Sequence, residues 1–159
     1  MLTVESRMQV TGLSGREVTD FLLNPTDAAY QAWWPGTHLR FHRRKPGGPD
    51  HVGDVVFMDE LVGSRRLRMS GVVESAEPGT AIVWRLRTGI RLPVRLALAL
   101  TDQVDGVAIR HTITAGWTGP GRLLDPLLRL YFSPRFAAAM DIHAHTEFSR
   151  LRDHLRAMD

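Results

Sequence analysis

The sequence contains no cysteine, and Lys45 is the only lysine among its twenty basic residues. The absence of cysteine excludes disulfides, thiol catalysis and cysteine metal ligands. No stretch approaches the ~20 apolar residues that a membrane-spanning helix needs. The N-terminal residues also lack the basic region and apolar run of a signal peptide. We therefore expect a cytoplasmic protein with no membrane span.

The composition is that of one globular domain, which we expect to cover residues 1–159. A chain with 43% hydrophobic and 23% charged residues can bury a core without disulfides. The net charge is +3, but the arginines are spread along the chain rather than gathered on one helix. This distribution argues against a nucleic-acid partner. The basic run at 40–45 is interpreted as a solvated hairpin.

Motifs for nucleotide binding and for serine hydrolases are missing. No glycine-rich loop leads from a strand into a helix, and no Gly-x-Ser-x-Gly elbow is present. We therefore expect no nucleotide and no other cofactor.

Alternating apolar residues predict a series of strands joined by short polar turns. A capping-box pair, Ser14 and Glu17, predicts a helix start, and a second short helix precedes Pro35-Gly36. The run 38–44 alternates around Leu39 and Phe41, which predicts these two on the buried face. In order, we predict a strand at 2–11, helices at 14–23 and 27–34, and strands at 38–44, 52–62, 65–77, 81–87, 93–101 and 107–117.

The last stretch, 133–159, has the longest helical pattern of the chain. Ser133 before Pro134 predicts an N-cap followed by proline at the first helical position. One stripe of the helix is apolar, and Glu147 lies within it, about 20° from Met140 at 100° per residue. A carboxylate on a buried face must be paired, protonated or beside a solvated cavity. An apolar segment, 123–132, precedes the helix and is predicted to cap the mouth of the sheet.

The element order resembles that of the START-like superfamily, also called SRPBCC, which includes polyketide cyclase/dehydrase and lipid-transport proteins. The resemblance rests on this order, on Trp33-Trp34-Pro35-Gly36, on Val52-Gly53-Asp54, and on the closing helix with His143 and Glu147. It implies an α+β helix-grip fold: a curved antiparallel sheet of about six to seven strands around a long C-terminal helix, with two short helices after the first strand. It also implies a deep apolar cavity between sheet and helix.

Three residues are catalytic candidates. Glu147 could act as a general acid or base, or it could pair with an arginine or reach solvent. His143, four residues earlier, could shuttle a proton with it, or the two could form an ordinary surface pair. His111 points by alternation to the covered face, either as a partner of Glu147 or as a hydrogen-bonded core residue. The helical pair alone is not a metal motif, so we expect no metal.

Asp59 and Glu60 follow a strongly apolar strand. One of two adjacent residues must point inward if the strand continues. We favour the alternative, in which the strand has already left the sheet.

Residues on the predicted inward faces are candidate ligand contacts, although such residues are often core. Aromatic rings among them could stack on an aromatic or polycyclic ligand, and others could form a rim at the cavity mouth. The candidates are Trp84, Trp117, Met140, Phe136, Ala144, Phe57, Met69, Leu98, Trp34 and Tyr131.

Three functions remain open. The first is binding of a hydrophobic small molecule: a polyketide, a lipid or an aromatic compound. The second is acid–base catalysis of the polyketide cyclase/dehydratase type, with Glu147 and His143 or His111. The third is a non-catalytic interaction protein that uses segment 123–132 as a partner surface. Fold analogy does not choose among them, and the chain is expected to be a monomer or a homodimer.

Overall fold

A computed structural model describes residues 1–88 and 90–158 as one curved sheet, several short helical segments and a long final helix. The strands are β1 (Leu2–Thr11), β2 (His38–Lys45), β3 (Val55–Val62), β4 (Arg65–Glu77), β5 (Ala81–Thr88), β6 (Ile90–Gln103) and β7 (Gly106–Ala115). The helices are α1 (Gly15–Leu23), α2 (Asp27–Trp33), the 3₁₀ helix η1 (Gly119–Leu124), α3 (Asp125–Tyr131) and α4 (Pro134–Arg156).

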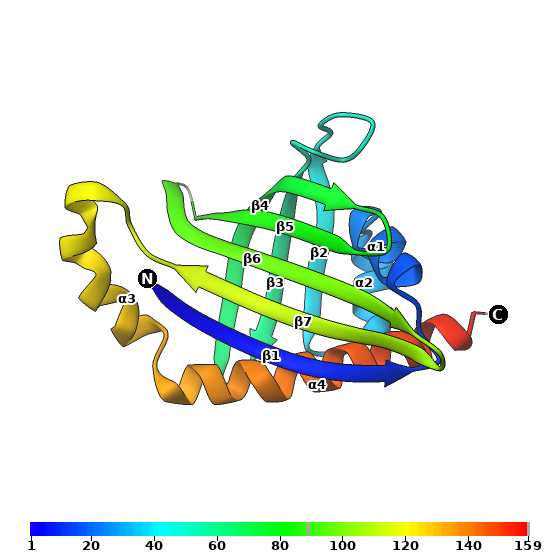
Figure 1. Cartoon of the computed structure of the whole chain (residues 1–159). Coiled ribbons are helices and arrows are strands. Elements are labelled where there is room, and N and C mark those ends of the chain that lie inside the picture. Colours follow the sequence, from blue (N-terminus) through cyan, green and yellow to red (C-terminus); the bar gives the residue numbers. More distant parts are fainter. Residues whose placement is uncertain (89, 159) are drawn as a thin grey trace.

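The seven strands form a single antiparallel sheet in the order β1-β7-β6-β5-β4-β3-β2. Only the β1–β7 neighbours are distant in sequence, so the rest is a meander of hairpins. The sheet curves, and α4 runs along its open side from α3 to α1 and α2 (Figure 1). This is the predicted α+β helix-grip architecture, with two short helices after the first strand.

Helix starts agree with their sequence signals. Ser14 accepts the backbone N–H of Glu17, whose carboxylate in turn accepts the Ser14 N–H at 2.8 Å. Ser133 accepts the Phe136 N–H at 3.3 Å, and Pro134 opens α4. These side chains satisfy N–H groups that the first helical turn cannot pair. Helix α4 ends at Arg156; Asp159, which closes the predicted range, lies outside the described residues.

Strand β2 departs from the expected alternation. Its pairing with β3 shifts register between His38 and Arg40, which marks a β-bulge. The bulge turns His38 inward together with Phe41, with 1% and 3% of their surfaces exposed, and leaves Leu39 only half-buried. The prediction that Leu39 shares the buried face with Phe41 was therefore wrong.

Strand β3 stays in the sheet beyond Asp59 and Glu60. It runs to Val62, which is 1% exposed, and pairs with β4 along its whole length, with Glu60 opposite Leu67. The preferred interpretation, that the strand leaves the sheet before Asp59 and Glu60, was wrong. Because the strand continues, Met58 and Glu60 share the concave face, while Phe57 and Asp59 point to the opposite face.

The C-terminal end of α4 is tied to the N-terminal segment. Arg156 forms an ion pair with Glu17 at 2.7 Å and donates to the carbonyl oxygen of Gly12. No helix in the described ranges is both long and apolar enough to cross a membrane.

Candidate functional site

A cavity of about 580 Å³ lies between the concave face of the sheet and α4. Most of its wall is apolar and comes from β3 to β7, α2, α3 and α4. The sheet contributes Met58, Leu67, Met69, Trp84, Leu86, Leu96, Leu98 and Ile113; the helices contribute Trp33, Leu127, Leu128, Tyr131, Phe132, Phe136, Met140 and Phe148, among others. A volume of this size is typical of small-molecule sites.

Segment α3 lies beside the start of α4 (Figure 1), and three of its residues line the cavity. Its lining residues Leu127 and Tyr131 are 59% and 47% exposed, so the cavity reaches the surface here. Arg65 at the start of β4 donates to the carbonyl oxygen of Tyr131 at 2.8 Å, and its guanidinium lies over the Tyr131 ring. This contact holds the end of α3 against the sheet.

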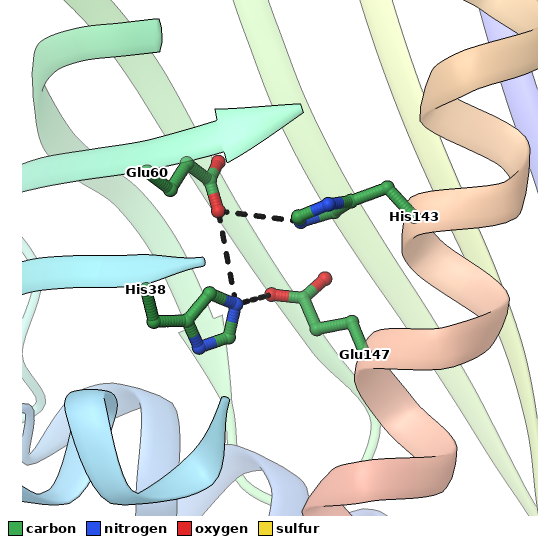
Figure 2. A group of neighbouring side chains, drawn as sticks. All are labelled: His38, Glu60, His143 and Glu147. Carbon is green, nitrogen blue, oxygen red and sulfur yellow. Dashed lines mark ion pairs between the residues drawn. The ribbon is translucent and has the colours of Figure 1, made fainter. Parts of the chain in front are cut away.

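Four polar side chains converge on one another beside this cavity (Figure 2): His38 from β2, Glu60 from β3, and His143 and Glu147 from α4. Glu60, His143 and Glu147 line the cavity, and His38 is buried behind them. His38 Nε2 lies 3.3 Å from Glu147 Oε1 and 3.9 Å from Glu60 Oε2. His143 Nε2 lies 3.4 Å from the same Glu60 oxygen. We call these four residues the His–Glu cluster.

Aromatic rings fix the two imidazoles. The His38 ring stacks on Tyr30 with centroids 3.9 Å apart and planes 5° from parallel. His143 stacks on Trp34 at 4.8 Å, and the Arg150 guanidinium lies over the same Trp34 ring. Stacking on both sides of the cluster limits rotation of the histidines and so preserves its geometry.

Opposite charges offset the desolvation of Glu60. Burial by itself raises the pKa of this carboxyl, but contact with His143 and the nearby charge of His38 outweigh it, and the pKa falls below its ordinary value. Burial lowers the pKa of His143, yet Glu60 and Glu147 outweigh that effect and raise it. The hydroxyl of Tyr30 donates to Glu60 at 2.7 Å; burial and the two carboxylates raise its pKa well above the usual value, so it stays a donor.

His111 on β7 lines the same cavity but stands apart from the cluster. Burial lowers its pKa, an effect opposed by the charges of Glu147 and Glu60. Its Nδ1 is buried without a hydrogen-bond partner among the described residues. Within that part of the chain, the ion pairs of Glu147 and Glu60 go to other histidines, so no direct His111–Glu147 pair forms.

Glu147 lies on the cavity wall. Its side chain is 13% exposed, lines the cavity and meets His38, rather than an arginine. His143 is likewise buried, 5% exposed, so the two do not form a surface pair. Their four-residue spacing places both on the cavity face, but each has its ion-pair partner on a strand, not on its own helix.

Six of the ten proposed ligand contacts line the cavity: Trp84, Met140, Phe136, Met69, Leu98 and Tyr131. Whether they touch a ligand stays a prediction.

The other four lie elsewhere. Phe57 is on the opposite face of β3, with the Arg44 guanidinium 4.0 Å from its ring centre. Trp117 follows the end of β7, where its N–H donates to Asp125. Trp34 lies behind His143, and Ala144 is fully buried in the core. Phe57 points away from the cavity because side chains alternate between the two faces of β3, and the neighbouring Met58 points into the cavity instead.

His38 and Glu60 were not among the predicted site residues. For Glu60 a signal was present, since Val62 after it extends the apolar pattern and one of the pair Asp59–Glu60 had to point inward. For His38 no such signal exists, because the bulge that turns it inward depends on pairing with β3.

No protein-family model matches the chain, and no curated protein matches its sequence. Solved structures share the fold at low sequence identity. Protein TTHA0849 of Thermus thermophilus is 11% identical, with 99% of each chain covered and a TM-score of 0.66. The Polyketide_cyc-like protein Cgl2372 of Corynebacterium glutamicum is 14% identical, with 98% of this chain and 92% of that chain covered and a TM-score of 0.57.

The di-domain ARO/CYC BexL of the BE-7585A biosynthetic pathway is 16% identical; the match covers 96% of this chain and 49% of that one, with a TM-score of 0.60. At such identities the likeness establishes the fold and leaves the activity open. The chain has the START-like, or SRPBCC, helix-grip fold.

Proposed function

We propose that this protein binds a hydrophobic small molecule whose polar group, a carbonyl or a hydroxyl, points at the His–Glu cluster. One observation carries the proposal: an apolar cavity of about 580 Å³ has charged and polar groups gathered on one wall. Ligand sites usually combine a mostly apolar surface with a few convergent polar groups that fix orientation. Two of the similar structures are a Polyketide_cyc-like protein and an ARO/CYC, which supports aromatic or polyketide-like ligands as the first class to test.

The test uses two probes, 1,8-dihydroxyanthraquinone and the parent anthraquinone, with binding followed by tryptophan fluorescence. Trp33 and Trp84 line the cavity and report on its occupancy. We expect the dihydroxy compound to bind at least several-fold more tightly than the parent. Equal affinities would show that the His–Glu cluster does not recognise the hydroxyl groups of the ligand. Absence of binding by both compounds would count against an aromatic ligand.

A matched pair of variants locates the binding. Met140→Trp fills the cavity from α4, whereas Ile142→Trp places the same ring on the outer face, where Ile142 is 68% exposed. We expect the first to abolish probe binding and the second to leave it unchanged, with both folded by circular dichroism. Unchanged binding by Met140→Trp would place the ligand outside the cavity.

Acid–base chemistry of the polyketide cyclase/dehydratase type is the second candidate. It is favoured by two histidines on one cavity whose pKa values move in opposite directions, His143 upward and His111 downward. Such divergence is a feature of sites that hold both an acid and a base. In this candidate Glu147 removes a proton alpha to a ligand carbonyl, and His143 or His111 protonates the leaving hydroxyl.

Glu147→Gln separates the two candidates, since it keeps the size of the side chain and removes its basicity. An enzyme would lose turnover of a linear poly-β-ketone substrate while its affinity changed by no more than a few fold. Asp141→Asn, on the exposed face of α4, is the control. Full turnover in the Glu147 variant would exclude this residue as the base.

A further inference from the structure

The nitrogen–oxygen distances within the His–Glu cluster are longer than those of ordinary hydrogen bonds. At 3.3, 3.4 and 3.9 Å, the contacts of His38 and His143 with the two carboxylates exceed the usual 2.7–3.2 Å of an N–H···O hydrogen bond. Neither His38 Nε2 nor His143 Nε2 has a hydrogen-bond partner among the described residues, although both are buried. Buried polar atoms of this kind need a partner.

The four side chains offer one ligand atom each, and these atoms all lie within 4.8 Å of one another. Ligands at the usual Zn–N and Zn–O distances of ~2.0–2.2 Å, placed tetrahedrally, are roughly 3.4 Å apart. Two of the observed separations, 3.3 and 3.4 Å, have this value, and the third is 3.9 Å. Figure 2 shows the two imidazoles and two carboxylates directed at a common point.

The charge and chemistry of the set suit a divalent cation. Two carboxylates supply two negative charges, and two imidazole nitrogens complete a nitrogen and oxygen donor set that zinc accepts. The side chains of His38 and Glu147 are only 0% and 13% exposed. These donors have therefore already lost most of their solvent, and binding an ion would remove little more.

Surrounding groups hold the donors in place. Tyr30 donates to Glu60 at 2.7 Å and stacks on His38, so one residue orients two donors. Metal-ligating histidines usually donate their second nitrogen to an acceptor. His38 Nδ1 has no such acceptor in the described residues, and the stacked Tyr30 ring takes over the orienting role.

We propose that His38, Glu60, His143 and Glu147 bind one Zn²⁺ ion that joins β2, β3 and α4. Four protein ligands are typical of structural zinc sites, in which the ion contributes to folding stability. The ion would fasten the central part of α4 to the β2 edge of the sheet. This departs from the expectation of no metal, which considered only spacing along one helix. With zinc bound, Glu147 and His143 would act as ligands rather than as base and acid. Zinc binding is measured without the hydrophobic ligand, so failure of this proposal and failure of the proposed function are separate outcomes.

The test begins with protein purified in EDTA, dialysed, and titrated with zinc chloride by calorimetry, with stoichiometry from elemental analysis. We expect one Zn²⁺ per chain, a Kd in the micromolar range or below, and a higher Tm with zinc than with EDTA. Co²⁺ in place of Zn²⁺ should give the visible absorption of a four-coordinate site. Absence of binding at 100 micromolar zinc chloride would overturn the proposal.

Variants assign the ion to the cluster. His143→Gln and Glu147→Gln should each weaken Zn²⁺ binding at least tenfold. His111→Gln, in the same cavity but outside the cluster, and His145→Gln, which removes the exposed Asp141–His145 pair, should bind as the parent does. If a cluster variant fails to fold by circular dichroism, the other decides. Unchanged affinity in a folded cluster variant, or loss of the ion only in His145→Gln, would overturn the assignment.

Discussion

His38 on β2 and Glu147 on α4 face each other at 3.3 Å, across the space between the edge of the sheet and the helix it grips. Glu60 and His143 form a second contact beside the first, at 3.4 Å. The two contacts join three elements beside a mostly apolar cavity. We therefore expect the same four side chains to contribute to stability and, under the proposed function, to orient the ligand.

The first prediction concerns the stability of this junction in metal-free buffer. His38→Phe keeps an aromatic ring against Tyr30 but leaves Glu147 and Glu60 short of one buried partner. We expect the free energy of unfolding to fall by about 3 kcal/mol, because removing one partner of a buried pair leaves the charge of the other buried and uncompensated. Urea denaturation measures the loss.

A double variant provides the control for that prediction. His38→Phe combined with Glu147→Leu removes both the histidine and the carboxylate left without a partner. The free energy of unfolding should therefore fall by less than in His38→Phe alone. A double variant as unstable as the sum of its single variants would show that the two residues do not act as a pair.

The second prediction concerns acid stability and Asp54, which is 2% exposed at the end of the loop into β3. Burial raises the pKa of this carboxyl, but hydrogen bonds from the Gly47 N–H, His51 and Arg43 outweigh it, so the pKa lies below its ordinary value of 3.8. The carboxylate therefore stabilises the fold above pH ~4, and this contribution is lost as the pH falls through the folded-state pKa.

Asp54→Asn should accordingly destabilise the protein by about 1–3 kcal/mol at pH 7, and the difference from the parent should shrink below pH ~4. Urea denaturation at several pH values measures both effects. Asp105→Asn, an exposed residue in the turn between β6 and β7, is the control and should behave as the parent at every pH. A difference that stays constant from pH 7 to pH 3 would contradict the assignment.

The third prediction concerns access to the cavity. Arg65 binds the carbonyl oxygen of Tyr131 and lies over its ring, which holds the end of α3. Arg65→Ala should speed amide hydrogen exchange in α3 and raise the dissociation rate of the anthraquinone probe several-fold, since local opening becomes easier. Arg110→Ala, exposed on β7, is the comparison. Unchanged exchange in α3 would show that this contact does not restrain the segment.

Much of the fold could be predicted from local patterns. The Ser14–Glu17 capping box and the Ser133–Pro134 helix start depend on residues a few positions apart, and both form as expected. Alternation in β1 and β7 places Val4 and Ile109 in the core because neither strand is interrupted. Element order then indicated the helix-grip fold.

The site was harder to predict because its parts come from three elements. The periodicity of α4 identified Glu147, and with it His143, as a polar side chain on an apolar face. The partners His38 and Glu60 depend on a β-bulge and on where β3 ends, and both are fixed by pairing between strands. No local pattern in the sequence specifies that pairing.

The methionines give the most direct test of binding in the cavity. Met58, Met69 and Met140 line it, whereas Met1, Met8 and Met158 do not. With ¹³C-labelled methionine methyl groups, addition of 1,8-dihydroxyanthraquinone should shift the NMR signals of the first three and leave the other three in place. Unshifted signals from all three cavity methionines at saturating probe, or shifts confined to Met1, Met8 and Met158, would contradict the proposal that this cavity binds the ligand.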